Sequence, residues 1–344
     1  MSTAASPAGH ASSPEASAAM LEVQGLDIFF RTGDGEVQAT SNISFAIAPG
    51  ERLGVVGESG CGKTVTGLSI LGLLPRGTSR VQGRILFDGR DLVGLSGREM
   101  RRIRGRHIGM IFQEPMSALD PVFTIGEQII ETLMAHRGLA RREARERAVE
   151  SLAKVGIPLP ARRVDEYPHQ LSGGMRQRAM IAIALACEPR LLIADEPTTA
   201  LDVTIQAQIL DLLLDLSERA GTALLFITHD LGVVAETCQR MLTMYAGEIV
   251  EDAPIDAALT RPYHPYTSGL LRSLPRLAPR KAALPSIPGR VPSPAAMPSG
   301  CRFRPRCPHA AAGCEEPQSM TSIASARRVR CRRASELDLP GAVA

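Results

Sequence analysis

The stretch Gly57-Glu58-Ser59-Gly60-Cys61-Gly62-Lys63-Thr64 decides the fold of this 344-residue chain. It fits the pattern G-x-x-x-x-G-K-[ST], and it stands between a short apolar run and the helical stretch Val65–Leu74. The glycines let the backbone curl so that successive N–H groups point at phosphate oxygens, with the positive end of a helix behind them. Lys63 adds a charge at the β and γ phosphates, and the Thr64 hydroxyl can ligate Mg²⁺. The stretch therefore predicts a nucleotide-phosphate site.

Short apolar runs separated by longer helical stretches indicate an α/β fold. The runs Leu53–Val56, Leu191–Ala194 and Ala223–Thr228 are nearly continuous and are bounded by polar or turn residues, as in strands buried on both faces. The stretch Ile125–Val155 interleaves Arg and Glu and predicts a solvent-facing helical subdomain inserted into the core. The sequence shows no internal repeat, so we expect one copy of the core.

Two carboxylates, Asp195 and Glu196, follow the second of these apolar runs. Because α/β folds bind ligands outside the carboxyl ends of parallel strands, we expect both side chains near the phosphates. Asp195 can hold Mg²⁺ through its water shell, and Glu196 can accept a proton from the attacking water. Alone, such a pair would be interpreted as solvated acids that end a strand. Together with the phosphate-binding stretch, it favours nucleotide hydrolysis.

Three further features fit the same chemistry. Gln113, at the end of an apolar run, offers an amide to metal and water, and His229 could hydrogen-bond the γ-phosphate. Taken alone, each is more often a solvated or structural residue. The glycines of Leu171-Ser172-Gly173-Gly174-Met175 precede the apolar helix Ala179–Cys187 and make a second anion-binding helix start. With Lys63 the only lysine at either helix start, the second one is predicted to serve the nucleotide of another subunit.

From Leu21 to Thr260 the sequence resembles the ATP-binding subunits of ABC transporters. The resemblance implies an α/β P-loop ATPase core with an inserted helical subdomain and an antiparallel β subdomain. In the family's order, the Walker A motif corresponds to Gly57–Thr64, the Q-loop to Gln113 and the signature to Leu171–Met175. The Walker B aspartate corresponds to Asp195 and the catalytic glutamate to Glu196. The D-loop corresponds to Ala200-Leu201-Asp202 and the switch histidine to His229. The aromatic residue expected to stack on adenine is Phe30, in preference to Phe29.

The resemblance thereby assigns three sets of residues. The expected catalytic residues are Glu196, His229 and Gln113. The expected Mg²⁺ ligands are Thr64, Gln113 and Asp195. The expected ATP contacts are Phe30, Gly57, Glu58, Ser59, Gly60, Cys61, Gly62, Lys63, Thr64, Val65, Gln113, Ser172, Gly173, Gly174, Asp202 and His229.

Members of this family act as dimers in which each signature closes on the ATP held by the other Walker A motif. One copy of the core therefore implies a second ATPase subunit. The longest apolar run, Ala179–Cys187, is far shorter than the roughly 18 residues of a membrane span, so separate permease subunits are also implied. The family docks them in the groove near Gln113 and the helical insert. We expect a peripheral protein on the cytoplasmic face of the cell membrane, because residues 1–19 lack the features of a secretory signal.

The chain changes character near residue 260. Residues 261–344 hold 14 Lys/Arg and 4 Asp/Glu, a net charge of +10, whereas residues 1–260 hold 25 against 32, a net charge of −7. This asymmetry suggests a separate module, although a solvated basic tail or one that lies on anionic lipid headgroups is the alternative. The expected division is a loose tail, an ATPase domain, a small Pro/Arg/Cys-rich C-terminal region and an end segment, at 1–19, 20–260, 261–335 and 336–344.

The C-terminal region narrows the resemblance. Arg261–Thr267, Ile287–Pro292 and Cys301–Cys307 resemble the corresponding region of the oligopeptide/dipeptide/nickel permease ATPases. Met175 and the stretch Ala200–Gln208 resemble the D-type member of a D/F heterodimer. The resemblance implies import of short peptides, with nickel chelates as the alternative, and adds two permease subunits and an extracytoplasmic peptide-binding protein as partners.

Four of the seven cysteines gather in this region, at Cys301, Cys307, Cys314 and Cys331. Relatives with this pattern are associated with a [4Fe–4S] cluster. The residues agree in part, because such a cluster takes four thiolates, whereas structural zinc more often has paired cysteines. An anionic cluster would also suit the surrounding arginines. Zinc and free thiols remain the alternatives. The arginines concerned are Arg302, Arg304, Arg306, Arg330, Arg332 and Arg333.

Composition and missing motifs exclude other classes. Aromatic residues make up 3% of the chain and Trp is absent, which argues against a nucleic-acid surface of stacked aromatic platforms. A soluble ABC ATPase of translation or DNA repair would usually carry two ATPase domains or a long coiled-coil insert. A P-loop GTPase would carry Asn-Lys-x-Asp, which is absent, and neither a GTPase nor a P-loop kinase would carry the signature.

Overall fold

The computed structural model describes residues 19–33, 35–198, 202–274, 286–293 and 296–342. Its strands are β1 (Leu21–Thr32), β2 (Gly35–Ile47), β3 (Arg52–Val56), β4 (Ser79–Phe87), β5 (Arg90–Asp91), β6 (Ile108–Ile111), β7 (Leu191–Asp195), β8 (Ala223–Ile227), β9 (Arg240–Tyr245), β10 (Glu248–Pro254), β11 (Thr321–Ala324) and β12 (Arg327–Val329). Its helices are α1 (Lys63–Ile70), α2 (Gly97–Ile103), α3 (Pro115–Ala118), α4 (Ile125–Arg137), α5 (Arg141–Lys154), α6 (Pro160–Arg163), α7 (Gly173–Leu185), α8 (Val203–Ala220), α9 (Leu231–Thr237), α10 (Ile255–Thr260) and α11 (Pro265–Arg272). Two short 3₁₀ turns, η1 and η4, cover Pro168–Gln170 and Arg304–Arg306.

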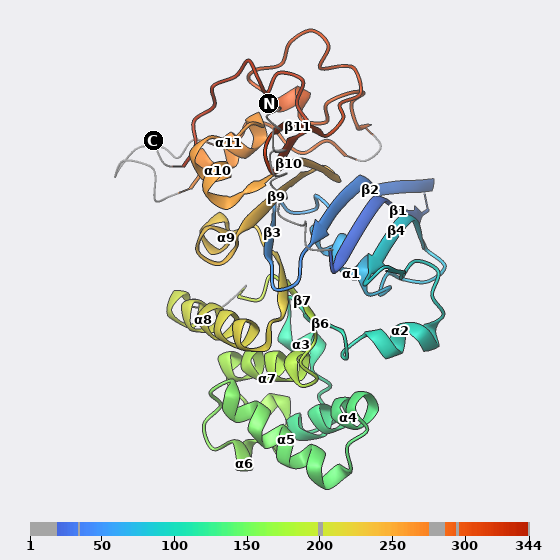
Figure 1. Ribbon diagram of the computed structural model, residues 1–344, viewed down its shortest axis with the longest axis vertical. Helices are drawn as coiled ribbons and strands as arrows, with labels where there is room; N and C mark the ends of the chain where they lie inside the picture. Colours follow the sequence, from blue (N-terminus) through green and yellow to red (C-terminus); the bar gives the residue numbers. More distant parts are fainter. Residues whose placement is uncertain (1–18, 34, 199–201, 275–285, 294–295, 343–344) are drawn as a thin grey trace, which may run out of the picture.

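Within the described residues, the strands form two sheets (Figure 1). The central sheet has eight strands in the order β11-β12-β10-β9-β3-β8-β7-β6, and the stretch from β9 to β6 is parallel. The second sheet has four antiparallel strands in the order β2-β1-β4-β5. The expected α/β core with an antiparallel β subdomain is therefore confirmed.

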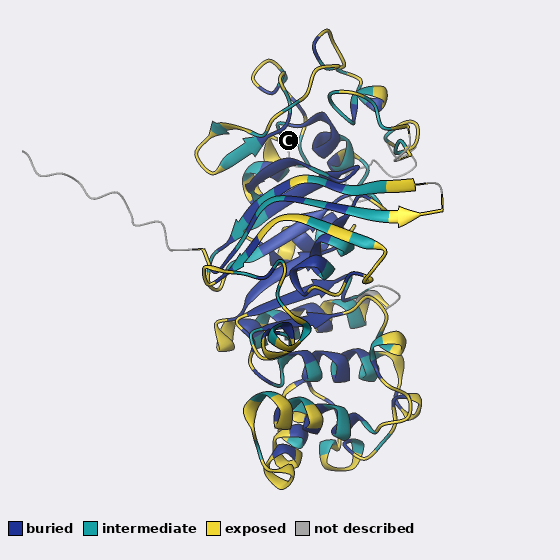
Figure 2. Cartoon of the chain, turned by 90° about the vertical axis from the view of Figure 1, so that its right-hand side faces the viewer, coloured by how far each residue is buried: buried dark blue, intermediate teal, exposed yellow. Residues whose placement is uncertain are grey.

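The central strands are buried on both faces, because alternate side chains enter two different cores. In β8, Leu224 and Phe226 pack with helices α4, α5, α7 and α8, whereas Leu225 and Ile227 pack with α1 and the four-stranded sheet. Figure 2 shows these strands as the most buried part of the molecule, with exposed residues on the outer faces of the helices. The nearly continuous apolar runs in the sequence reflect this packing on two sides.

The predicted helical insert consists of separate helices. Helix α4 is capped by Thr124, whose Oγ1 accepts a hydrogen bond of 3.2 Å from Glu127 N, and it ends at Gly138 in the left-handed conformation with φ 68°. Helix α5 follows and presents buried Ala144, Ala148 and Leu152 to the core. The insert lies at one end of the molecule and α10–α11 lie toward the other (Figure 1). In the described ranges, no helix is both long and apolar enough to cross a bilayer.

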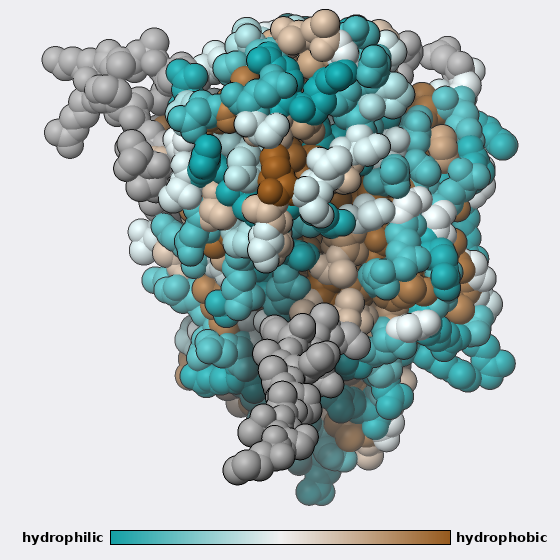
Figure 3. All heavy atoms as spheres, turned by 45° about the horizontal axis from the view of Figure 1, so that its top comes forward, coloured by the Kyte–Doolittle hydropathy of each residue, from teal (hydrophilic) through white to brown (hydrophobic). Residues whose placement is uncertain are grey.

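The C-terminal region continues the central sheet. Strand β12 pairs with β10, so that Val329 faces Glu251, and β11 extends the edge further. A small aromatic core, Tyr245, Tyr266 and Phe303, joins β9, α11 and the turn before η4, with ring centroids 4.7–5.3 Å apart. Figure 3 shows a mainly hydrophilic surface at this end of the molecule, with scattered hydrophobic residues.

The basic excess of the C-terminal region is largely paired in the structure. Arginines on β12, on η4 and next to these elements form ion pairs with acidic residues of the core. Others pair with acidic residues of the C-terminal region itself, such as Arg332 with Glu316 at 3.1 Å. The region is thus attached to the acidic core by charge as well as by strands. The pairs with the core are Arg302–Glu248, Arg306–Glu58, Arg327–Glu251, Arg328–Asp252 and Arg330–Glu248.

Candidate functional site

The phosphate-binding stretch forms the loop between β3 and α1, as expected. Two of its glycines adopt a backbone that other residues rarely take: Gly57 has φ 154° and Gly62 has φ 100°. A Cβ atom at position 57 would lie 2.2 Å from the carbonyl oxygen of Met244, and one at position 62 would lie 2.9 Å from Thr40. The loop therefore depends on glycine for both conformation and space. Ser59 and Gly60 form its exposed part, and Val65 lies half-buried in α1.

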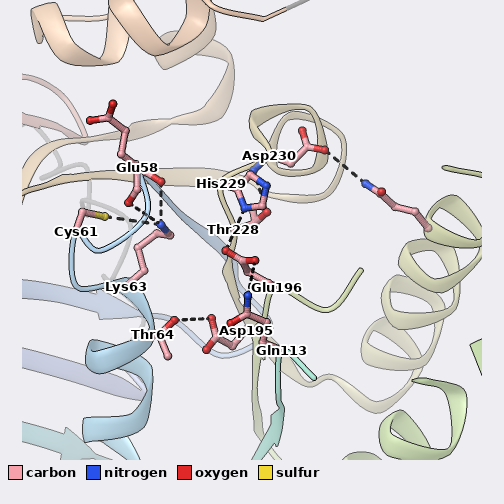
Figure 4. A network of polar contacts seen from close by, with 12 residues as sticks. Glu58, Cys61, Lys63, Thr64, Gln113, Asp195, Glu196, Thr228, His229 and Asp230 are labelled. Carbon is pink, nitrogen blue, oxygen red and sulfur yellow. Dashed lines mark hydrogen bonds and ion pairs between the residues drawn. The ribbon is translucent and has the colours of Figure 1, made fainter. Parts of the chain in front are cut away.

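Lys63 and Thr64, at the start of α1, point to the two sides of the site (Figure 4). The buried Lys63 Nζ donates to the carbonyl oxygens of Gly57 at 2.8 Å and Glu58 at 3.2 Å. Thr64 Oγ1 donates to Asp195 Oδ1 at 3.1 Å, so the hydroxyl and carboxylate expected at Mg²⁺ lie together. Burial raises the pKa of Asp195 to about 6, and the bond from Thr64 opposes that rise. Cys61, within the loop, is buried.

Glu196 is the centre of a second group of polar contacts. Gln113 Nε2 donates to its Oε2 at 3.0 Å, and His229 Nδ1 lies 3.0 Å from its Oε1. Figure 4 shows both side chains directed at this carboxylate from opposite sides. Glu196 has φ 47°, a left-handed conformation that is uncommon for a residue with a side chain, and its N–H donates to Ile227 O on the neighbouring strand β8. The backbone thus turns sharply after Asp195, and the two carboxylates face different partners.

The signature stretch caps helix α7. Ser172 Oγ accepts from Met175 N at 3.3 Å, as an N-cap residue does. Gly173 has open space where a Cβ would be, and a Cβ on Gly174 would meet only Ile205, at an ordinary 3.5 Å. The packing of this chain therefore requires neither glycine. Sequence reasoning missed the buried Gln177 on the same helix, whose amide donates to the carbonyl oxygen of Pro197 and ties the signature helix to the segment after Glu196.

The remaining predicted contacts have mixed outcomes. Phe29 is covered by Arg80, whose guanidinium carbon lies 4.0 Å from the ring centroid, whereas Phe30 packs half-buried against the core. Because a cation occupies one face of Phe29, the preference for Phe30 as the adenine contact stays the better prediction. Asp202 is exposed at the start of α8. The other D-loop residues, Ala200 and Leu201, lie outside the described residues.

Two residues of the C-terminal region reach the phosphate loop at Glu58, and sequence reasoning did not predict either contact. Tyr266 Oη accepts from Glu58 N at 2.9 Å. Arg306 donates to both carboxylate oxygens of Glu58, at 2.6 and 2.9 Å. Both residues stand in the segments quoted for the family resemblance. Nothing local could identify their partner, because it lies more than 200 positions away in the sequence.

The four C-terminal cysteines line one small cavity of about 20 Å³, together with Phe303 and His264. All four are free thiols and partly buried. Burial raises the pKa of Cys307 and of Cys331 to about 11, and the nearby thiols contribute to both shifts. Among the described residues, no three His, Cys, Asp or Glu side chains converge closely enough to hold a metal ion.

Two protein families match this chain. The family described as ABC transporter matches residues 40–199, and the family described as oligopeptide/dipeptide transporter, C-terminal region, matches residues 250–314. A probable peptide ABC transporter ATP-binding protein of Sinorhizobium fredii is 53% identical over 321 residues, which cover 92% of this chain and 96% of that protein. A peptide import ATP-binding protein of Brucella abortus is 51% identical over 314 residues, 91% of this chain and 95% of its own.

Solved structures with the same core are ATP-binding cassettes. A dimeric cassette in a post-hydrolysis state, bound to ADP and Pi, matches with a TM-score of 0.61 and 31% identity over 69% of this chain and 99% of its own. CbiO1 of Clostridium perfringens, part of an ABC transporter complex, matches with a TM-score of 0.58 and 28% identity over 69% of this chain and 89% of its own.

Proposed function

Because this chain belongs to the ABC transporter ATP-binding proteins, and to those with the oligopeptide/dipeptide transporter C-terminal region, we propose that it hydrolyses ATP to energise the import of di- and oligopeptides. The observation that carries this proposal is the position of Glu196 between Gln113 and His229, next to the Thr64–Asp195 pair and the phosphate loop. Nickel chelates are the alternative cargo. A soluble, non-transport ABC ATPase is less consistent with the C-terminal family match.

Each residue has a role that its contacts support. Lys63 exchanges its bonds to the Gly57 and Glu58 carbonyls for the β and γ phosphates when ATP enters. Thr64 and Asp195 would hold Mg²⁺, with Gln113 as a further ligand, and the metal would supply positive charge that neutralises the phosphates. Glu196 accepts the proton of the attacking water. His229 fixes the orientation of that carboxylate and contacts the γ-phosphate.

Ser172, Gly173 and Gly174 contact the ATP held by a second ATPase subunit in this proposal. The support is that the chain's own packing does not require these glycines, which leaves the start of α7 open to an outside phosphate. Asp202 lies exposed at the start of α8 and would face the same interface. The sequence around Met175 favours a heterodimer with a different subunit over a homodimer.

A surface beside Gln113 supports docking to two permease subunits of the membrane. Phe112, Met116, Val122 and Phe123 are large apolar residues with exposed fractions of 37%, 53%, 70% and 51%. Monomeric proteins rarely leave such neighbouring apolar side chains in water, and a partner helix would cover them. With these partners and an extracytoplasmic binding protein, the chain would be a peripheral subunit at the cytoplasmic face of the membrane.

The C-terminal cysteines would hold a [4Fe–4S] cluster, with zinc as the alternative. Cys301, Cys307, Cys314 and Cys331 line the same cavity and supply the four sulfur donors that the cluster takes. The raised pKa values of Cys307 and Cys331 mean that their thiolate forms would be stabilised by a bound cation. A space of about 20 Å³ holds roughly one water molecule, so the cysteine loops would move apart around a cluster. Bound there, the group would cross-link a region that has few regular elements.

Metal analysis tests the cysteine centre. Protein purified without oxygen should contain about four iron and four sulfide per chain, and a Cys301→Ser, Cys331→Ser double variant should lose both. Cys238→Ser, a change at a buried cysteine of the core, serves as the control and should keep the metal. Stoichiometric zinc in place of iron would favour the alternative ion. A metal-free protein with an ordered C-terminal region and full activity would contradict both.

The transport proposal is tested by identifying what stimulates the ATPase. The complex should be purified from membranes with its permease subunits and binding protein, and reconstituted in vesicles. Peptide-loaded binding protein should raise ATP hydrolysis and drive peptide uptake, whereas a nickel chelate should do neither. Stimulation by the nickel chelate alone would favour nickel-chelate import over peptide import. An ATPase that co-purifies with no membrane subunit would contradict a transport role.

A further inference from the structure

Glu58 is the only acidic residue of the phosphate loop, and its carboxylate is turned away from Lys63 (Figure 4). Each of its polar groups is tied. Its carbonyl oxygen accepts from Lys63 at 3.2 Å, its N–H donates to Tyr266, and its carboxylate accepts two hydrogen bonds from Arg306. The partners of its N–H and of its carboxylate therefore come from the C-terminal region, one from α11 and one from η4.

Arg306 is held firmly in this position. Its side chain is 4% exposed, and its Nε also donates to the carbonyl oxygen of Pro288 at 2.9 Å. Its guanidinium lies 5.7 Å from the ring centroid of Tyr245 and 6.0 Å from that of Phe303. A planar guanidinium that is buried near two rings and bonded to a backbone carbonyl oxygen binds a carboxylate in one geometry. Arg306 thus both neutralises Glu58 and fixes its direction.

The charge of Glu58 matters because of where it stands. An uncompensated carboxylate in a loop whose N–H groups bind a polyphosphate repels that ligand, and the repulsion is strong where the protein excludes water. Asp195 and Glu196 have roles that require their charge in the proposed mechanism, whereas Glu58 has none. Its carboxylate is compatible with nucleotide binding only when a cation covers it.

We propose that Arg306 of the C-terminal region is a positioning residue for the ATP site, which makes the phosphate loop competent for nucleotide by neutralising Glu58 and holding its carboxylate away from the phosphates. In this role the C-terminal region takes no part in the chemical step and does not contact ATP itself. It acts through Glu58, with Tyr266 fixing the backbone of the same residue. This inference rests on the proposed role of Gly57–Thr64 as the phosphate-binding loop.

The position of Arg306 connects the loop to the cysteine cavity. Arg306 belongs to the turn between Cys301 and Cys307, in which Arg304 N donates to Cys301 O and Cys307 N donates to Arg304 O. The same guanidinium that holds Glu58 is therefore carried by a turn whose two ends are thiols of the cavity. Any change that spreads these thiols would move Arg306 relative to the loop.

The test is a suppressor experiment on nucleotide affinity in the full chain, with titration by a fluorescent ATP analogue. Arg306→Gln should weaken nucleotide binding about tenfold, because the half-buried carboxylate of Glu58 loses its cationic partner. Adding Glu58→Gln should restore the affinity to within about threefold of the wild type, because the repulsive charge is removed. A role of Arg306 in packing alone would not allow this rescue, because Glu58→Gln restores none of the contacts that Arg306 makes with Pro288, Tyr245 and Phe303.

Three controls separate the outcomes. Arg304→Gln alters a partly exposed arginine of the same turn, which pairs with Glu315 and not with Glu58, and should bind nucleotide normally. Arg306→Lys keeps the positive charge without the bidentate bond, so its nucleotide affinity should lie between those of the wild type and Arg306→Gln. If Arg306→Gln does not fold, Arg306→Lys takes its place in the test. Lys63→Ala should abolish binding, and normal binding by that variant would overturn the phosphate-loop assignment itself. With Lys63→Ala inactive, unchanged affinity in Arg306→Gln, or no rescue by Glu58→Gln, would overturn the proposal alone.

Discussion

The phosphate loop and the C-terminal region are held in place by different kinds of contact. The loop is shaped by bonds between near neighbours, such as Thr66 Oγ1 to Gly62 O at 2.8 Å and Lys63 Nζ to Gly57 O. The C-terminal region has few regular elements and depends on long-range contacts: strand pairing with β10, an aromatic core with Tyr245, and ion pairs to the acidic core. The turn of the loop is thus shaped largely by its own sequence, whereas the C-terminal region needs the finished core as a template.

This difference predicts which property of the protein a substitution in each region should change. A change in the core site should alter chemistry and leave the fold intact, because its side chains lie at or just after the ends of strands that are buried for other reasons. A change in the C-terminal region should alter stability or the loop it touches, because its residues carry no chemistry on ATP. The predictions below test this division, beginning with the largest expected effect.

Glu196→Gln should lower ATP turnover by about 100-fold or more, since removal of a general base costs that much, and should keep ATP binding intact. The amide is the same size and can still meet Gln113 and His229, so the fold should be unchanged. Phosphate release and nucleotide affinity measured on the same preparation check this. Glu188→Gln is a matched control, because Glu188 also has φ 47° but lies away from the site. Normal turnover in Glu196→Gln would remove this residue from the base role.

Ser172→Ala should lower turnover at the partner's nucleotide about tenfold to 100-fold, because a hydrogen bond to a charged phosphate is lost. It should leave the affinity of this chain's own phosphate loop unchanged. The change also removes a helix cap, which costs about 1 kcal/mol of stability by itself. Thr124→Ala removes the same kind of cap from α4 and provides the control. Equal effects of the two variants on turnover in a reconstituted dimer would contradict a shared site.

The places of the core-site residues in the fold could be predicted because their signals are local, whereas their roles stay predictions. The motif Gly57–Thr64 predicts the conformation of its loop, and the position of Asp195 and Glu196 after a buried strand places them at a defined edge of the sheet. Sequence order alone also led to Gln113 and His229, which the structure brings to the same carboxylate. The predicted strands match β3, β7 and β8 within one residue at each end.

The contacts of the C-terminal region could not be predicted in this way. The charge asymmetry suggested a separate module, but β11 and β12 extend the central sheet. The excess arginines of the C-terminal region form ion pairs with acidic residues of the core, so the opposite charges of the two parts attract one another. No periodic pattern reveals that Arg306 meets Glu58 or that Tyr266 meets its N–H, because pairing across 200 residues is decided by the tertiary fold. The four cysteines line one cavity, as clustering in sequence suggested, but spacing does not identify what they bind.

Phe303→Ala should lower the free energy of unfolding by about 3–5 kcal/mol, the usual cost of deleting a buried aromatic side chain. Because the C-terminal strands belong to the central sheet, we expect one cooperative transition at a lower temperature instead of separate melting of residues 261–335. Calorimetry and limited proteolysis distinguish the two. Val122→Ala, a change at an apolar side chain that is 70% exposed, should have almost no effect. Early, isolated loss of the C-terminal region would restore the idea of an independent module.

The smallest predicted effect is a pH dependence set by His264, a fully buried imidazole in the C-terminal region whose Nδ1 accepts from Tyr266 N at 3.1 Å. Burial lowers the pKa of His264 from its ordinary value near 6.5 to about 3. Between these values the unfolded chain binds a proton that the folded chain does not, so stability is fully present above pH 6.5 and is lost as pH falls.

The slope expected from this one group is about 1.4 kcal/mol per pH unit below pH 6. Buried acids with raised pKa values, such as Asp195 and Glu251, act in the opposite direction, so the wild type alone would not isolate the histidine. His264→Asn keeps a side chain that can accept at the start of α11 but does not titrate. Denaturant unfolding at pH 5 and pH 7.5 should therefore show a smaller loss of stability on acidification in the variant than in the wild type. Equal losses would mean that the imidazole is not held neutral by its surroundings, and that the interior of the C-terminal region is more open to water than that of the core.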